Sequence, residues 1–148
     1  MSGTIIYQSR IYRADLQANP TVLYVFGDNF LRRGMGGQAG EMRGEPNAVG
    51  VATKWAPSHR REAFFSDDQF ERIIDAINAD VHPLWKHLDA GGVVVAPLDG
   101  IGTGLSQLPT RAPRIYRYIC DLGLGAVGPE KVEAVPPPPD PALRKDYP

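Results

Sequence analysis

The chain has 148 residues, the usual length of one globular domain, and 43% of them are hydrophobic, which excludes disorder of the whole chain. Its 16 basic and 17 acidic residues give a formal net charge of -1. A duplex-DNA-binding protein normally carries an excess of basic charge, so this balance disfavours nucleic acid as the main partner.

The first half of the chain predicts three strands and one short helix. Residues 5–7 form a brief apolar run, and residues 22–27 form a continuous β-branched and aromatic run that is typical of a strand buried on both faces. A glycine-rich loop, residues 34–37, follows the second run and leads into a short predicted helix, residues 38–43. Residues 48–53 predict a third strand.

The middle of the chain predicts a long helix and a fourth strand. Residues 66–69 (Ser-Asp-Asp-Gln) fit a capping box, and apolar side chains recur at helical spacing over residues 70–88. Pro83 lies inside this pattern and predicts a kink or two consecutive helices. Residues 93–97 form a second strand of the buried type, followed by a second glycine loop at residues 100–104.

The last part of the chain predicts one helix, one short strand and a tail. We expect a helix from about Thr110, with Gly123 as its C-terminal cap, and a short strand at residues 131–135. These elements complete one domain, residues 1–135, of the layered α/β class with a largely parallel or mixed sheet. Residues 136–148 are rich in proline and polar residues, and we expect a polyproline-like or disordered tail.

Disulfide, metal, cofactor and membrane sites are not expected. A single cysteine, Cys120, excludes an internal disulfide and a cysteine-rich zinc site. The three histidines, His59, His82 and His87, show no metal-ligand spacing with carboxylates. No apolar run approaches the roughly 20 residues of a membrane span, and the N-terminus lacks a signal-peptide pattern. We therefore expect a soluble, cytoplasmic protein with no membrane partner and no metal; its oligomeric state stays open.

The two glycine loops are the strongest functional signal. In open α/β sheets, ligands bind beyond the carboxyl ends of the strands, and glycine lets the backbone approach an anion closely. Each loop by itself is equally well explained as a tight strand-to-helix turn, but together they favour a ligand that carries phosphate. Neither loop is a Walker A or a dinucleotide-binding sequence. Polar residues beside the strand ends are further candidates: Asp15, Asn29, Lys54 and Asp99.

Three segments resemble the macrodomain superfamily, which binds ADP-ribose. They are residues 13–16 (Arg-Ala-Asp-Leu), residues 25–29 continued by 34–39, and residues 95–97 continued by 100–105. Order and spacing agree over about residues 5–135. The resemblance implies a three-layer α/β/α sandwich with a mixed central sheet. It also implies that ADP-ribose, or a related NAD-derived nucleotide, is the ligand.

The resemblance assigns roles to individual residues. Asp15 would contact the adenine, and Asn29 would position the distal ribose. The diphosphate would be held by the backbone amides of Gly34, Gly36, Gly37, Gly102, Thr103 and Gly104.

Within the superfamily, the chain is most similar to the branch that removes terminal ADP-ribose from proteins. Thr53-Lys54 resembles the segment of that branch whose lysine attacks the anomeric carbon of the ribose. The catalytic carboxylate of the branch is replaced here by Ser106, and Asp99 is the one nearby substitute. The resemblance thus implies hydrolysis of ADP-ribosyl linkages on protein or nucleic acid through Lys54. The alternatives are a non-catalytic reader or sequestering protein for such nucleotides, and an interaction module that uses the Pro-rich tail.

Overall fold

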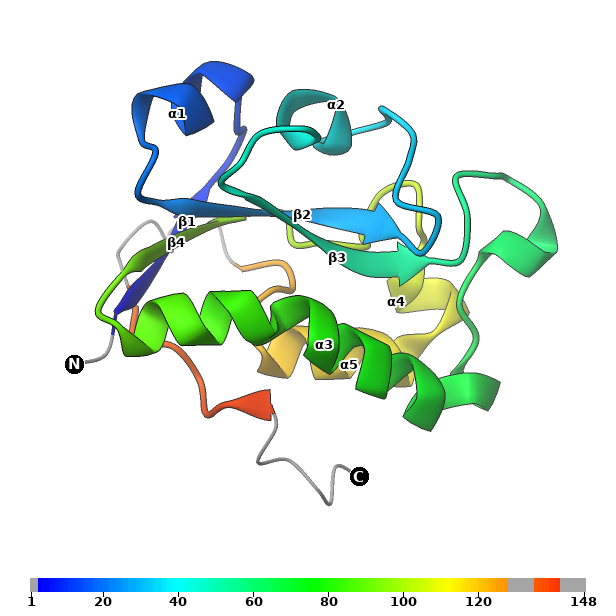
Figure 1. Cartoon of the computed structure of the whole chain (residues 1–148). Coiled ribbons are helices and arrows are strands. Elements are labelled where there is room, and N and C mark those ends of the chain that lie inside the picture. The colour runs from blue at the N-terminus through cyan, green and yellow to red at the C-terminus, as the bar shows by residue number, and fades with distance from the viewer. Residues whose placement is uncertain (1–2, 128–134, 142–148) are drawn as a thin grey trace.

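The computed structural model describes residues 3–127 and 135–141, and it contains one four-stranded sheet (Figure 1). The strands are β1 (Thr4–Gln8), β2 (Leu23–Asn29), β3 (Ala48–Lys54) and β4 (Val93–Pro97), and their order in the sheet is β1-β4-β2-β3. All neighbouring strands are parallel. The α/β class is therefore confirmed.

The expectation of a mixed sheet is wrong for the described strands. Each strand-to-strand connection contains a helix, which carries the chain back to the start of the sheet before the next strand begins. Antiparallel pairing in the described residues is limited to two isolated bridges, Ile5 with Val135 and Lys54 with Phe64.

Helices cover both faces of the sheet (Figure 1). Helices α1 (Arg13–Ala18) and α2 (Ala39–Met42) lie on one face, and α3 (Phe70–Asp89) and α5 (Pro113–Asp121) lie on the other, with α4 (Leu108–Arg111) beside them. The larger apolar core joins the sheet to α3 and α5, and a smaller one lies under α1 and α2. Within the described residues, no helix is long and apolar enough to span a membrane.

The longest helix, α3, passes through Pro83 without dividing, so the alternative of two consecutive helices is wrong. Two 3-10 turns, Arg61–Ala63 and Asp67–Gln69, precede it. The hydroxyl of Ser66 accepts a hydrogen bond from the Asp68 N–H at 3.3 Å, which begins the second turn. Pro83 lies on the exposed side of α3, where water can solvate the carbonyl that loses its partner.

The helix expected from about Thr110 is two helices, α4 and α5. Ala112 separates them with φ -146°, a value outside the helical range, and Pro113 begins α5. The carboxylate of Asp67 accepts hydrogen bonds from the backbone N–H groups of Arg114 and Ile115, at 2.9 and 3.0 Å, and so caps α5. Gly123 follows the helix with φ +80°, which confirms it as the C-terminal cap.

The segment after the domain lies against it as far as residue 141. Val135 exchanges two backbone hydrogen bonds with Ile5, at 2.8 and 2.9 Å. The indole N–H of Trp85 donates to the carbonyl of Pro138 at 3.2 Å, and Pro141 is buried. Residues 136–141 of the expected tail therefore pack on the domain. Residues 131–134 of the expected last strand, and residues 142–148 of the tail, lie outside the described residues.

The packing of α3 predicts a large effect of one core substitution. Ile77 is fully buried in the larger core, so Ile77→Ala should lower the free energy of unfolding by about 2–5 kcal/mol through lost burial and a residual cavity. Urea unfolding followed by circular dichroism measures this difference. Asp75→Ala, at an exposed position of α3, is the control and should change stability by less than about 0.5 kcal/mol. Equal losses in the two variants would contradict the described orientation of α3.

Candidate functional site

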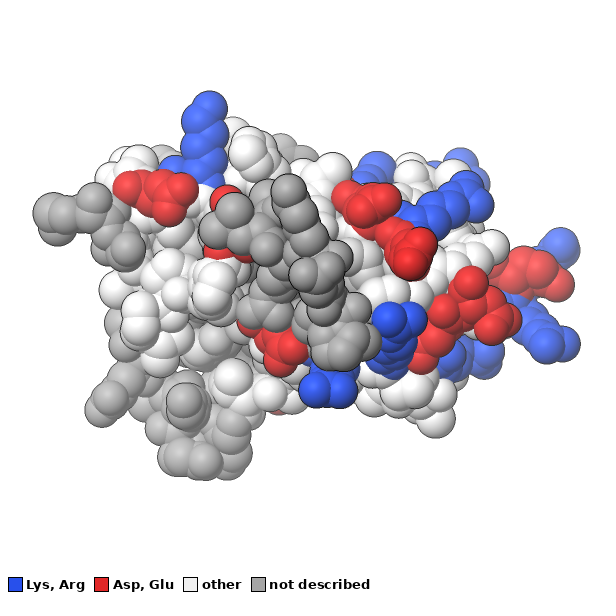
Figure 2. All heavy atoms as spheres, turned by 90° about the horizontal axis from the view of Figure 1, so that it is seen from below, with Lys and Arg blue, Asp and Glu red and all other residues white. Residues whose placement is uncertain are grey.

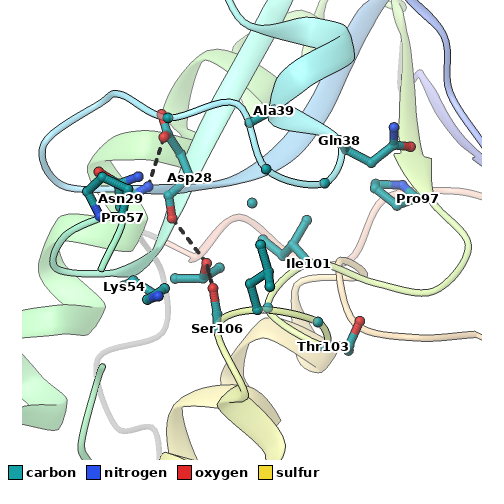
Figure 3. Close-up of a pocket in the computed structure, with 18 of the residues that line it drawn as sticks. Asp28, Asn29, Gln38, Ala39, Lys54, Pro57, Pro97, Ile101, Thr103 and Ser106 are labelled. Atoms are coloured by element: carbon teal, nitrogen blue, oxygen red, sulfur yellow. Dashed lines mark hydrogen bonds between the residues drawn. The ribbon is translucent and has the colours of Figure 1, made fainter. Parts of the chain in front are cut away.

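A cavity of about 520 Å³ lies beyond the carboxyl ends of β2, β3 and β4, in the size range of small-molecule sites. Both glycine loops form its wall, as the sequence predicted. Figure 3 is a close-up of the cavity, in which Gln38 and Ala39, at the start of α2 directly after the first loop, face Ile101 and Thr103 of the second loop. Of the predicted site residues, the cavity brings together Asn29, Gly34, Gly36, Gly37, Lys54, Asp99, Gly102, Thr103 and Gly104.

The two loops approach each other closely. A Cβ atom built on Gly36 would lie 2.8 Å from Cδ1 of Leu105, so a side chain at this position would require the exposed Leu105 side chain of the facing loop to move. Met35 and Leu105, one from each loop, are exposed apolar side chains on the cavity wall. At Gly37 and Gly104, by contrast, a Cβ atom would meet nothing within 4 Å, so the backbone there borders open space.

The backbone N–H groups of these loops are free of protein partners. In residues 3–127 and 135–141, no acceptor pairs with the N–H groups of residues 34–37 or residues 102–104. Backbone donors in a folded protein are nearly always paired with protein, water or ligand. The cavity is therefore rich in unused hydrogen-bond donors, an arrangement that suits an anion.

A buried ion pair ties the first loop to the sheet. The Asp28 carboxylate in β2 accepts two hydrogen bonds from the Arg43 guanidinium, at 2.5 and 3.2 Å, and a third from its neighbour's N–H at 2.8 Å. Arg43 also donates through Nε to the Gly34 carbonyl at 2.8 Å. The sequence analysis missed both residues. The available signal was an acidic residue inside a buried strand, because such a carboxylate requires a partner.

Asn29 holds the turn after β2. Its amide nitrogen donates to the Arg33 carbonyl at 2.7 Å, and its amide oxygen accepts from the Leu31 N–H at 3.0 Å. Arg32, between them, has φ +55°, a left-handed conformation that is unusual for a residue with a side chain. Its guanidinium is paired with Asp80 at 2.7 Å. Asn29 thus shapes the cavity wall as well as facing the cavity.

Lys54, the last residue of β3, is 6% exposed and lines the cavity. Its Nζ donates to the Ser58 carbonyl at 2.7 Å and lies 4.3 Å from the centre of the Phe64 ring. The Arg111 guanidinium lies 3.7 Å from the centre of the same ring. Burial, and then the positive charge of Arg111, lower the pKa of Lys54 below its ordinary value. Asp99 lines the same cavity, but the described residues contain no ion pair between it and Lys54.

Asp15 is not on the cavity wall. Its carboxylate accepts hydrogen bonds from the Tyr12 N–H at 2.8 Å and from the Gln8 side chain at 2.9 Å, and it thereby begins α1. Gln8 is the last residue of β1, so Asp15 lies at the same edge of the sheet as the cavity. Its contact with an adenine stays a prediction.

A chain of hydroxyl groups joins the second glycine loop to β3 and β2 (Figure 3). The Thr53 Oγ1 atom lies 2.6 Å from Ser106 Oγ and donates to the Asp28 carbonyl at 3.1 Å. Thr53 is 1% exposed and Ser106 is 9% exposed, and both line the cavity. Within the described part of the chain there is no cluster of three or more metal-ligating side chains.

The Asp28–Arg43 pair predicts a stability effect that needs no ligand. Asp28→Asn removes the charged partner of Arg43 and should lower the free energy of unfolding by about 2 kcal/mol, less than the 3–5 kcal/mol of a fully buried pair because Arg43 is partly exposed. Glu45→Gln, in the more exposed pair with Arg13, is the control and should cost less than about 1 kcal/mol. Urea unfolding at pH 7 measures both variants. A cost for Asp28→Asn no greater than that of the control would contradict the structural role given to this pair.

Comparison with known proteins identifies the family of the chain but not its function. No curated protein and no solved structure matches the chain. One family model matches residues 6–122, which include β2, β3, β4, the last three residues of β1, both glycine loops and the residues of the cavity wall. The chain therefore belongs to DUF7831, a family of unknown function.

Proposed function

We propose that the protein binds ADP-ribose or a related NAD-derived nucleotide in the cavity between the two glycine loops. The observation that carries the proposal is the set of unpaired backbone N–H groups at residues 34–37 and 102–104, which border one cavity from two sides. A diphosphate offers several acceptor oxygens to such donors at once. This donor arrangement is a recurrent way in which α/β proteins hold phosphate groups.

The charges around the cavity support an anionic ligand. The cationic side chains on its wall are those of Arg33, Arg43 and Lys54. The Asp28 carboxylate is compensated by Arg43, which leaves Asp99 as the one carboxylate of the wall without an ion pair in the described residues. On the face of α3 and α5, by contrast, acidic and basic residues are interspersed (Figure 2).

The rest of the wall suits the other parts of such a nucleotide. Exposed Met35 and Leu105 offer apolar surface for a base or a sugar ring, and the volume of about 520 Å³ is sufficient for a drug-sized ligand.

The proposal includes a macrodomain-like three-layer architecture. Helices on both faces of the sheet favour it, whereas the four parallel strands depart from the mixed sheet that the resemblance implied.

Gly104 provides a direct test of nucleotide binding. A Cβ atom at this position meets no protein atom within 4 Å, so Gly104→Val should fold normally but place methyl groups where the ligand approaches the loop. We expect wild-type protein to bind ADP-ribose in calorimetric titration and to be stabilised by it, since a ligand at a hundredfold excess over Kd adds about 2.7 kcal/mol. Gly104→Val should bind at least tenfold more weakly. Ala79→Val, at an exposed position of α3, is the control. Absence of heat and of stabilisation with the wild type would overturn the proposal.

A second candidate function, hydrolysis of ADP-ribosyl linkages, is favoured by the environment of Lys54. Nucleophilic attack requires a neutral amine, and burial together with Arg111 shifts Lys54 toward that form. In this reaction the Nζ lone pair forms a bond to the anomeric carbon and the bond to the modified group breaks. The proton that Nζ loses passes to the Asp99 carboxylate and from there to the leaving group. Water later cleaves the new C–N bond, which releases the sugar and restores the amine. The alternative, a non-catalytic reader, is favoured by Ser106 in place of a carboxylate and by the lack of a Lys54–Asp99 ion pair in the described residues.

The pH dependence of ADP-ribose release distinguishes the two candidates. The neutral fraction of Lys54 rises with pH, so a Lys54-dependent rate should rise and then level off at a pH below the ordinary lysine pKa of 10.5. Arg111→Gln removes one cause of the lowered pKa and should move the profile to higher pH. Arg117→Gln, at an exposed position of α5, should leave it in place. Release from ADP-ribosylated protein and DNA is measured over the pH range, with Lys54→Met as the blank. Binding without any release supports the reader.

A further inference from the structure

The direction of one proton in the hydroxyl chain can be derived from the atoms around it. A threonine hydroxyl carries one proton, and Thr53 Oγ1 donates it to the Asp28 carbonyl, which can only accept. Thr53 therefore has no proton left for the 2.6 Å contact with Ser106. Ser106 must then be the donor in that hydrogen bond, and its own single proton points to Thr53 Oγ1.

Ser106 consequently presents only lone pairs to the cavity. Ser106 lines the cavity, and no second partner is found for its hydroxyl oxygen in residues 3–127 and 135–141. This arrangement excludes Ser106 as a proton donor to a ligand. A phosphate or carboxylate oxygen, which also lacks a proton, would be repelled at this point, whereas a hydroxyl group would be bound.

The cavity wall therefore has two regions, one with hydrogen-bond donors and one with a hydrogen-bond acceptor. The unpaired N–H groups of residues 34–37 and 102–104 are donors and suit phosphate oxygens. Ser106, a few residues further along the second loop, is an acceptor and suits a hydroxyl. Lys54, next in sequence to Thr53, also lines the cavity. A ligand that satisfies both groups has a diphosphate followed by a hydroxylated sugar.

We propose that Ser106 is a specificity-determining residue that accepts a hydrogen bond from a hydroxyl group of the distal sugar, so that the cavity selects a sugar-bearing diphosphate over one whose terminal group has no hydroxyl. This inference rests on the proposed nucleotide binding and deepens it. Thr53 is a positioning residue: it fixes the Ser106 proton through its own bond to the Asp28 carbonyl.

A thermodynamic cycle between protein and ligand tests this assignment. Calorimetric titration compares ADP-ribose with an analogue in which a tetrahydrofuran ring without hydroxyl groups replaces the distal ribose. On the wild type we expect the analogue to bind about tenfold more weakly. A buried polar group that loses its hydrogen-bond partner costs about 1.4 kcal/mol, and this free energy corresponds to a tenfold change in Kd. On Ser106→Ala the two ligands should bind within about twofold of each other.

Two further variants separate hydrogen bonding from packing. Thr53→Val keeps the shape of the side chain but frees the Ser106 proton. Ser106 can then donate as well as accept, so this variant should keep the preference for ADP-ribose, because a sugar hydroxyl still finds a partner there. Thr110→Ala, which removes an exposed hydroxyl on α4, should keep the wild-type preference. Equal binding of the two ligands by the wild type would overturn the role of Ser106 while leaving nucleotide binding intact. A preference that persists in Ser106→Ala would overturn it as well. Binding of neither ligand by the wild type would overturn the proposed function and this inference together.

Discussion

The common direction of the four strands is the constraint on which the site depends. In a parallel sheet, every loop that follows a strand begins at the same edge, however far apart the strands lie in the sequence. The chain uses this edge for the loops after β2, β3 and β4, and all three contribute to the cavity wall. The helical connections set the direction of the strands. The position of the site is therefore a consequence of topology, and its chemistry is a consequence of the residues at the edge.

The interactions around this edge hold the groups of the cavity wall in place. The Arg43 guanidinium links the Asp28 carboxylate in β2 to the Gly34 carbonyl in the first loop, and Asn29 closes the turn between them. The second loop is tied to β3 by Ser106 and Thr53. For the proposed ligand, donors and acceptors held in this way would lose little conformational entropy on binding, which would leave more of the interaction free energy for affinity and selectivity.

The sequence predicted the elements whose evidence is local. The uniform apolar run at residues 93–97, the 3.6-residue periodicity of α3 and the glycine cap at Gly123 each depend on neighbours within a few positions. The parallel direction of all four strands depends on the connections between them, and the division of α4 from α5 at Ala112 depends on tertiary packing. The Asp28–Arg43 pair joins residues 15 positions apart, and the orientation of the Ser106 proton depends on three segments at once. Such contacts leave no periodic pattern, so a single sequence does not reveal them.

Two residues with side chains, Arg32 and Gln107, adopt left-handed backbone conformations, with φ of +55° and +51°, and each lies beside one of the glycine loops. Such conformations cost on the order of 1 kcal/mol each, and they persist because the surrounding contacts outweigh that cost. The ion pair with Asp80, a residue of α3, supports Arg32 from the far side of the sheet. Hence the shape of the cavity mouth depends in part on a contact with α3, outside the loops that form the wall, so a substitution in that helix would alter the cavity without touching its lining.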